Sequence, residues 1–219
     1  MRLFEHLSDI VLPSTCPGCG RWSRPCCADC VSLLRRLEPV ERGPTGRLRL
    51  YALGTYAGPA RQLVLAYKER GRRDLAAPLA AVLAEALLEL AIVPGPGRWW
   101  LVPAPSRAAA SRLRGGPHME LLARRCAAAL TAVGRRAAVA PALRLARGVR
   151  DAAGLTAAAR ADNLAGRVGV VRARLPPRGE AVVLVDDVVT TGVTAAACAR
   201  ALREAGVRVR AFVALTAAT

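Results

Sequence analysis

Aromatic side chains are scarce in this chain of 219 residues: Phe, Trp and Tyr make up 4% of it, whereas hydrophobic residues as a whole make up 53%. The core must therefore be built mainly from Ala, Val and Leu. No run of about eighteen uncharged apolar residues is present, so we expect no membrane-spanning helix. The N-terminus lacks the apolar stretch of a signal peptide, and we interpret the protein as cytoplasmic.

Lysine and acidic residues are also few. Asp and Glu together number 16 against 33 Lys and Arg, which gives a formal net charge of +17. This charge favours a phosphate or nucleic-acid partner, although a GC-rich coding bias would explain the preference for Arg over Lys. Lys68 is the only lysine. It is either a solvated cation or, because a compact ammonium differs from a planar guanidinium, a contact for a pyrophosphate oxygen.

Histidine is limited to His6 and His118, and neither stands in a sequence context that suits a general base. No Ser-His-Asp set is evident, which argues against hydrolysis by an activated serine.

The most informative stretch runs from Ala181 to Thr194. It starts with an apolar run rich in β-branched residues, which predicts a strand of a parallel sheet buried on both faces. Asp186 and Asp187 come at the carboxyl end of that strand and are followed by a Thr/Gly loop. An Ala-rich segment, 195–205, then predicts a helix that ends at Gly206. Ligands of parallel α/β sheets bind at this edge.

The residue types of this loop suit a phosphorylated sugar. A helix N-terminus offers unpaired N–H groups to an anion, Gly192 lets the anion approach the backbone, and threonines add hydroxyl donors. Asp186 and Asp187 would repel a phosphate, so we expect them to accept hydrogen bonds from sugar hydroxyls or to hold Mg²⁺. The alternative is a core strand that ends in a solvated turn. A P-loop would need a lysine here, and a dinucleotide-binding turn would need more glycines.

The stretch 183–194 resembles the phosphoribosyl pyrophosphate (PRPP) signature of type I phosphoribosyltransferases almost position for position. The resemblance implies that the two acids meet the ribose hydroxyls and that the 190–194 loop cradles the 5′-phosphate. The PRPP-binding residues that it implies are Asp186, Asp187, Val188, Val189, Thr190, Thr191, Gly192, Val193 and Thr194. The candidate catalytic residues are Asp186, Asp187 and Lys68. Lys68, Arg107 or an arginine of the segment 144–163 would neutralise the leaving group.

Five of the seven cysteines lie between Cys16 and Cys30. The pairs Cys16-x2-Cys19 and Cys27-x2-Cys30 have the spacing of the two knuckles of a Cys₄ zinc site. We predict that these four residues hold a structural Zn²⁺, and that Cys26 is a spare that could replace Cys27. The alternative, a cysteine-rich loop without metal, would leave this segment with little to hold it folded.

Proline and glycine between residues 39 and 46 indicate a boundary between a module of residues 1–45 and a domain of residues 46–219. The pattern predicts strands within 48–57 and at 99–102, 139–143, 168–171 and 207–215, and helices near 3–11, within 59–92 and at 120–130.

The loop after the strand at 99–102 offers amides, a hydroxyl and cations to an anion. In type I phosphoribosyltransferases the loop after the first core strand holds pyrophosphate. By resemblance we assign this role to Ala104, Pro105, Ser106 and Arg107. The arginine-rich segment 144–163 occupies the place of the mobile hood loop that closes over the reaction centre.

Cysteine knuckles in front of such a domain give the layout of the ComF family, known from bacterial DNA uptake and natural transformation. The resemblance covers nearly the full length. It implies an α/β fold of the type I phosphoribosyltransferase kind, a parallel sheet flanked by helices, with a small N-terminal Cys₄ zinc ribbon. Two departures fall near the presumed mouth of the site. The family continues Arg-Gly with Phe-Asn-Gln, where this chain has Gly116-Pro117-His118, and it often has Gln where Ala152 stands.

Two functions follow from this resemblance. The first is an enzyme that binds PRPP, or another phosphoribosyl ligand, with Mg²⁺ and joins C1 of the ribose to a nitrogen nucleophile. The second is a non-catalytic adaptor that uses the basic surface and the zinc ribbon to bind single-stranded DNA or a competence helicase. A regulator that senses PRPP is a third alternative.

Overall fold

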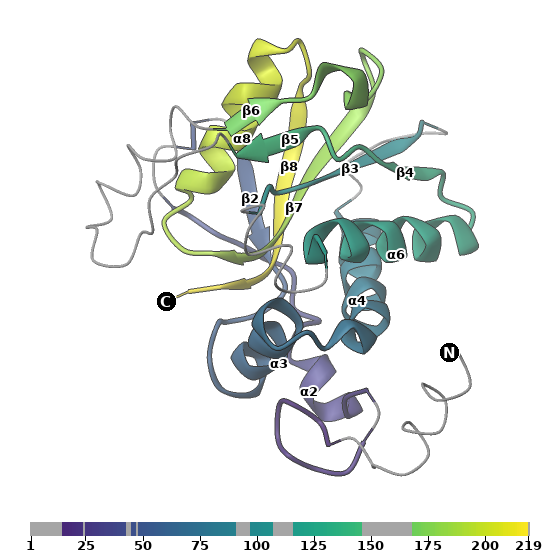
Figure 1. Ribbon diagram of the computed structural model, residues 1–219, viewed down its shortest axis with the longest axis vertical. Coiled ribbons are helices and arrows are strands. Elements are labelled where there is room, and N and C mark those ends of the chain that lie inside the picture. The colour runs from purple at the N-terminus through teal and green to yellow at the C-terminus, as the bar shows by residue number, and fades with distance from the viewer. Residues whose placement is uncertain are drawn as a thin grey trace.

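The computed structural model describes residues 15–23, 25–42, 45–46, 48–90, 97–106, 116–145 and 168–218. A six-stranded sheet with the order β1-β2-β8-β7-β3-β4 forms the centre (Figure 1). Its strands are β1 Glu38–Pro39, β2 Arg49–Ala52, β3 Trp99–Pro103, β4 Ala137–Val139, β7 Ala181–Val189 and β8 Val209–Ala217. Among these strands only β1 runs antiparallel to its neighbour. The predicted α/β fold with a mostly parallel sheet is therefore confirmed.

Helices cover both faces of this sheet. They are α3 Gly58–Glu69, α4 Ala76–Glu89, α6 His118–Ala132 and α8 Val193–Glu204, whereas the short helix α2 Ala28–Ser32 packs on α3 and α4. Turns of 3₁₀ type lie at Arg73–Leu75 and Arg172–Arg174. Figure 1 shows α3, α4 and α6 on one side of the sheet and α8 on the other. A hairpin of β5 Leu143–Leu145 and β6 Val168–Val170 packs beside α8. Within the described ranges, no helix has the length and apolar character that a membrane crossing requires.

The central strand β7 joins the two halves of the hydrophobic core. Val183 and Val185 pack with α3, α4 and α6, whereas Val182 and Leu184 pack with α8. All four side chains are fully buried, and burial of each stabilises the fold by about 1.5–3 kcal/mol. This strict alternation explains why the sequence shows an unbroken apolar run, and it also determines where the two acids that follow point.

Two sequence predictions on secondary structure need correction. The single strand predicted at 139–143 is two strands, β4 and β5, which belong to different sheets. Pro141 lies between them and has no N–H for a ladder, which ends the pairing there. The helical region predicted at 59–92 is broken after α3 at Gly71, whose φ of 69° does not fit a helix. The helix predicted near 3–11 and the hood segment beyond residue 145 lie outside the described residues.

The cysteine segment packs directly on α3. A Cβ on Gly18 would lie 2.7 Å from Cys30 Sγ and 3.3 Å from Cβ of Pro59, which is in the first turn of α3. At the other end of α3, the Arg72 guanidinium donates a hydrogen bond of 2.9 Å to the carbonyl of Pro25. Helix α3 thus packs against both the cysteine segment and the sheet. The boundary between residues 45 and 46 stays a prediction.

Candidate functional site

Strand β7 leads through the acid pair and the threonine loop into helix α8. The strand continues to Val189, so the two acids lie within its last residues and not after it. Residues 190–192 form the turn, and α8 begins at Val193. Gly192 caps the helix with a φ of 77°, a left-handed conformation that glycine adopts without strain. The predicted order of strand, hydroxyl and glycine loop, and helix is confirmed.

The start of α8 is suited to an anion. Its N-terminus has no side-chain cap, and the first helical hydrogen bond runs from the N–H of Ala196 to the carbonyl of Gly192. The first N–H groups of a helix have no partner within it, and the helix dipole adds partial positive charge there. Thr190 and Thr191 are exposed beside these amides. A phosphate can therefore be bound by backbone and hydroxyl donors together.

The two acids point to opposite faces of the sheet, because successive residues of a strand alternate. Asp187 lies on the face of α3 and α6 and is only 4% exposed. Asp186 lies on the face of α8, close to Cys198. Burial is the larger cause that raises the pKa of the Cys198 thiol, and the charge of Asp186 raises it further. One Asp186 carboxylate oxygen also accepts a 2.8 Å hydrogen bond from the N–H of Asp187. The acids are adjacent in sequence but face different surroundings.

Asp187 is held by two basic side chains from different helices. Lys68 Nζ, in the last turn of α3, lies 2.9 Å from Asp187 Oδ1. His118 Nε2, from the first residue of α6, lies 2.8 Å from Asp187 Oδ2. Burial alone would raise the pKa of Asp187, but the His118 hydrogen bond and the Lys68 charge outweigh burial and lower it. Burial likewise opposes the charge on Lys68, yet Asp187 raises the Lys68 pKa.

Asp186 has the opposite electrostatic character. Its side chain is half-buried, and burial together with the charge of Asp187 raises the pKa of Asp186 to about 7, although Lys68 acts against this rise. The two acids therefore differ in ionisation: Asp187 is ionised throughout the neutral range, and Asp186 gains and loses its proton near neutrality.

His118 is the residue of the candidate site that the sequence reasoning missed. Its backbone carbonyl accepts a 2.5 Å hydrogen bond from the Tyr67 hydroxyl, and its ring meets the Tyr67 ring edge-on at 5.8 Å between centroids. Arg73 fixes the preceding segment through a 2.7 Å bond to the carbonyl of Gly116. The departure from Phe-Asn-Gln at 116–118 was the available signal, but the partner of His118 lies 69 residues further along the chain, beyond the reach of local patterns.

The predicted pyrophosphate loop lies at the same edge of the sheet as the acids. Pro103, the last residue of β3, pairs with Val185 of β7. The N–H of Ala104 is already bound to the carbonyl of Val185 at 2.8 Å, and Pro105 has no N–H. Among the described residues of this loop, Ser106 therefore supplies the donors that are suited to an anion. Arg107 lies outside the described residues.

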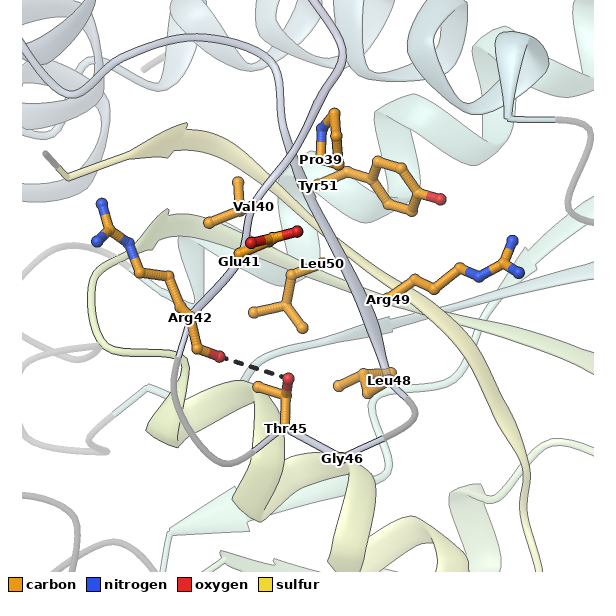
Figure 2. Close-up of a pocket in the computed structure, with 10 residues that line it drawn as sticks. All are labelled: Pro39, Val40, Glu41, Arg42, Thr45, Gly46, Leu48, Arg49, Leu50 and Tyr51. Atoms are coloured by element: carbon orange, nitrogen blue, oxygen red, sulfur yellow. Dashed lines mark hydrogen bonds between the residues drawn. The ribbon is translucent and has the colours of Figure 1, made fainter.

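A hollow of about 400 Å³ lies at the β1–β2 hairpin, and Figure 2 shows its lining side chains. None of the predicted site residues that the structure describes lines it. The connection between β1 and β2 does lie against the turn before α8, because a Cβ on Gly192 would lie 3.1 Å from both the carbonyl oxygen of Arg42 and Cγ2 of Thr45. The Arg42 guanidinium donates a 2.7 Å hydrogen bond to the carbonyl of Ala218. The turn before α8 is thus held in place by the connection between β1 and β2.

The four cysteines predicted as ligands form one cluster. The sulfur atoms of Cys16, Cys19, Cys27 and Cys30 all lie within 4.8 Å of one another, and those of Cys19 and Cys27 are 3.6 Å apart. A tetrahedral zinc ion with Zn–S bonds of about 2.3 Å separates its sulfurs by about 3.8 Å. The cluster therefore fits zinc, and Cys26 does not belong to it.

The thiols of this cluster are electrostatically uneven. Burial opposes ionisation of Cys16, but hydrogen bonds from backbone N–H groups, of which those of Cys27 and Cys19 act most, lower its pKa to about 6. Burial and the neighbouring thiols raise the pKa of Cys30. Thiols packed this closely cannot all lose their protons without a cation between them, so the cluster is suited to a metal ion.

A comparison with solved structures aligns this chain with adenine phosphoribosyltransferases. Adenine phosphoribosyltransferase from Saccharomyces cerevisiae aligns with a TM-score of 0.35 and 15% identity over 84% of this chain and 85% of that chain. The enzyme of the same name from Rhodothermus marinus aligns with a TM-score of 0.34 and 18% identity over 85% and 86% of the two chains. No protein-family model and no curated protein matches the chain.

Proposed function

We propose that the chain binds PRPP with Mg²⁺ and transfers its phosphoribosyl group to a nitrogen nucleophile. One observation carries this proposal: β7 runs buried into an acid pair and then turns, within residues 190–192, into the uncapped start of α8. A sugar phosphate needs an anion cradle and hydroxyl acceptors close together. The end of β7 supplies both within a few residues, in the sequence pattern that resembles the PRPP signature.

Each part of the ligand has a group that suits it. The amides at the start of α8, with Thr190 and Thr191, would bind the 5′-phosphate. Asp186, whose side chain is only partly buried, would accept hydrogen bonds from the ribose hydroxyls, and Asp187 would accept one with the oxygen that Lys68 leaves. Ser106 and Lys68 would bind the pyrophosphate. Mg²⁺ held by the pyrophosphate would neutralise part of its charge as it leaves.

In the transfer itself, the bond from C1 of the ribose to the pyrophosphate oxygen breaks and a bond from C1 to nitrogen forms. Positive charge develops on the ribose between these events, and carboxylates at this edge of the sheet stabilise it. Pyrophosphate takes the electron pair of the broken bond, so a cation such as Lys68 beside it lowers the barrier.

Isothermal titration calorimetry with PRPP and MgCl₂ tests the proposal. We expect binding by the wild-type chain and a loss of at least about tenfold in affinity, or about 1.4 kcal/mol, for Asp186→Asn. Arg200→Met on the exposed face of α8 is the matched control and should bind as the wild type does. Absence of binding heat at millimolar PRPP would overturn the proposal.

The second candidate function, binding of single-stranded DNA, is favoured by one exposed side chain. Trp22 in the cysteine segment is 75% exposed, and it neighbours the exposed Arg21 in a chain with a net charge of +17. Exposed aromatic rings beside cations stack on bases. A gel-shift titration across salt concentrations tests this: Trp22→Ala should weaken binding, and Asp186→Asn should leave it unchanged. Equal binding by Trp22→Ala would remove this candidate.

A further inference from the structure

Among the described residues, the carboxylate of Asp187 has two side-chain partners that differ in how deeply they are buried. Its side chain is 5% exposed and is bound by Lys68 on one oxygen and by His118 on the other. The Lys68 side chain is 33% exposed, whereas that of His118 is 4% exposed. Lys68 therefore reaches solvent, and His118 is enclosed by the core.

We infer that His118 is the permanent partner of Asp187, and that Lys68 is its exchangeable partner, which moves to the pyrophosphate when the ligand binds. This inference rests on the proposed function and adds a positioning residue to it. His118 would not touch the ligand. Its effect would be to keep Asp187 ionised, oriented and hydrogen-bonded while Lys68 is engaged elsewhere.

The physical reason is the cost of an unpartnered buried charge. A carboxylate that loses its only partner inside a protein loses the compensation for its desolvation, and this destabilises the state that contains it. Lys68 can leave Asp187 without this penalty only if another donor stays on the carboxylate. His118 Nε2, at 2.8 Å from Asp187 Oδ2, is that donor.

The anchoring of the two side chains supports this division. His118 is held at its backbone by Tyr67 and at its ring by the edge-on contact with the same residue, so its position depends on the packing of α3 against α6. Lys68 has a flexible stem and an ammonium group that can turn its three donors toward a new acceptor. The loop from Ala104 to Ser106 leaves β3 at the edge of the sheet where Asp187 lies. A pyrophosphate bound by this loop would therefore lie at the same edge as Lys68.

Nuclear magnetic resonance gives a direct test, because Lys68 is the only lysine and His118 is one of two histidines. A chain labelled with ¹⁵N-lysine has a single ammonium resonance, and ¹⁵N-histidine gives two imidazoles that His6→Leu tells apart. We expect PRPP with Mg²⁺ to shift the Lys68 resonance while His118 Nε2 keeps its proton. Ribose 5-phosphate, which has no pyrophosphate, should leave Lys68 in place. Movement of both side chains, or of neither, overturns the inference.

Calorimetry with the same two ligands separates positioning from a merely structural role. His118→Leu should lose at least about tenfold in PRPP affinity and less than about threefold in ribose 5-phosphate affinity. His118→Gln, which can still donate a hydrogen bond, should recover most of the PRPP loss. Equal losses with both ligands would show a structural role and overturn the inference.

Controls keep the outcomes distinct. Tyr67→Phe removes the bond to the His118 carbonyl but leaves Asp187 untouched, so it should follow the wild type more closely than His118→Leu does. Thermal unfolding confirms that each variant is folded, and the His118→Gln variant keeps the test valid where His118→Leu does not fold. Absence of binding by the wild type to either ligand overturns the proposed function as well, whereas binding without movement of Lys68 overturns this inference alone.

Discussion

Replacement of Lys68 by methionine removes one partner of a buried carboxylate while keeping the aliphatic stem. The Lys68–Asp187 distance is 2.9 Å, with side-chain exposures of 33% and 5%. Breaking a fully buried ion pair costs about 3–5 kcal/mol, and breaking an exposed one costs about 0–1 kcal/mol. Because Lys68 is one-third exposed and His118 remains on Asp187, we expect a cost of about 2 kcal/mol.

Urea unfolding followed by circular dichroism measures this cost. A loss of about 2 kcal/mol lowers the melting temperature of a chain of this length by about 4–8 °C. In a double-mutant cycle with Asp187→Asn, the combined cost should be smaller than the sum of the single costs by about 1 kcal/mol or more, since both changes remove the same contact. Arg200→Met is the control, because its pair with Glu204 is 3.9 Å long and exposed, and we expect it to change stability by less than about 0.5 kcal/mol. Additive costs, or a Lys68→Met cost as small as that control, would refute the reasoning.

Three further predictions follow from the site. The pKa of the Asp186 carboxyl is higher in the folded protein than in the unfolded chain, so protonation of this group stabilises the fold; the contribution is fully present below about pH 4 and is lost as the pH rises to about 7. The urea midpoint of the wild type should therefore be lower at about pH 8 than at about pH 5, and that of Asp186→Asn should be the same at both. Metal analysis should find one zinc ion per chain, retained in Cys26→Ser and lost in Cys19→Ser, and equal zinc in both variants would contradict the ligand set. Gly192→Ala should destabilise the fold by about 1–2 kcal/mol and weaken PRPP binding. The control Gly134→Ala, at a similar φ of 79° but with open space around it, should cost less stability and leave binding unchanged. Equal effects of the two substitutions would show that the contacts at Gly192 are irrelevant.

Local sequence patterns were sufficient for the frame of the molecule. The β-branched run predicted β7, the Ala-rich run with its terminal glycine predicted α8, and the cysteine spacing predicted the cluster that the sulfur distances bear out. These features depend on residues that are close in sequence, where periodicity and spacing act directly. The turn at Gly192 belongs to the same class.

The electrostatic arrangement could not be predicted in this way. Lys68, His118 and Asp187 come from α3, α6 and β7, and their meeting depends on how those elements pack. The sequence context of His118 does not suit a base, because its own neighbours indicate no acid nearby. The separation of Asp186 from Asp187 was accessible in principle, since adjacent strand residues face opposite sides, but only once the strand was known to continue through both acids to Val189.

Helix α3 contacts the cysteine segment at its first turn and Asp187 at its last turn. Pro59 in its first turn lies against Gly18 between the knuckle cysteines, and Lys68 in its last turn holds Asp187. Nine residues separate the two contacts, or about 14 Å of helix. A helix of this length is a stiff rod, so a tilt imposed at the thiol end displaces the ammonium at the far end. Helix α3 thus connects the cysteine cluster to Asp187 near the carboxyl end of β7.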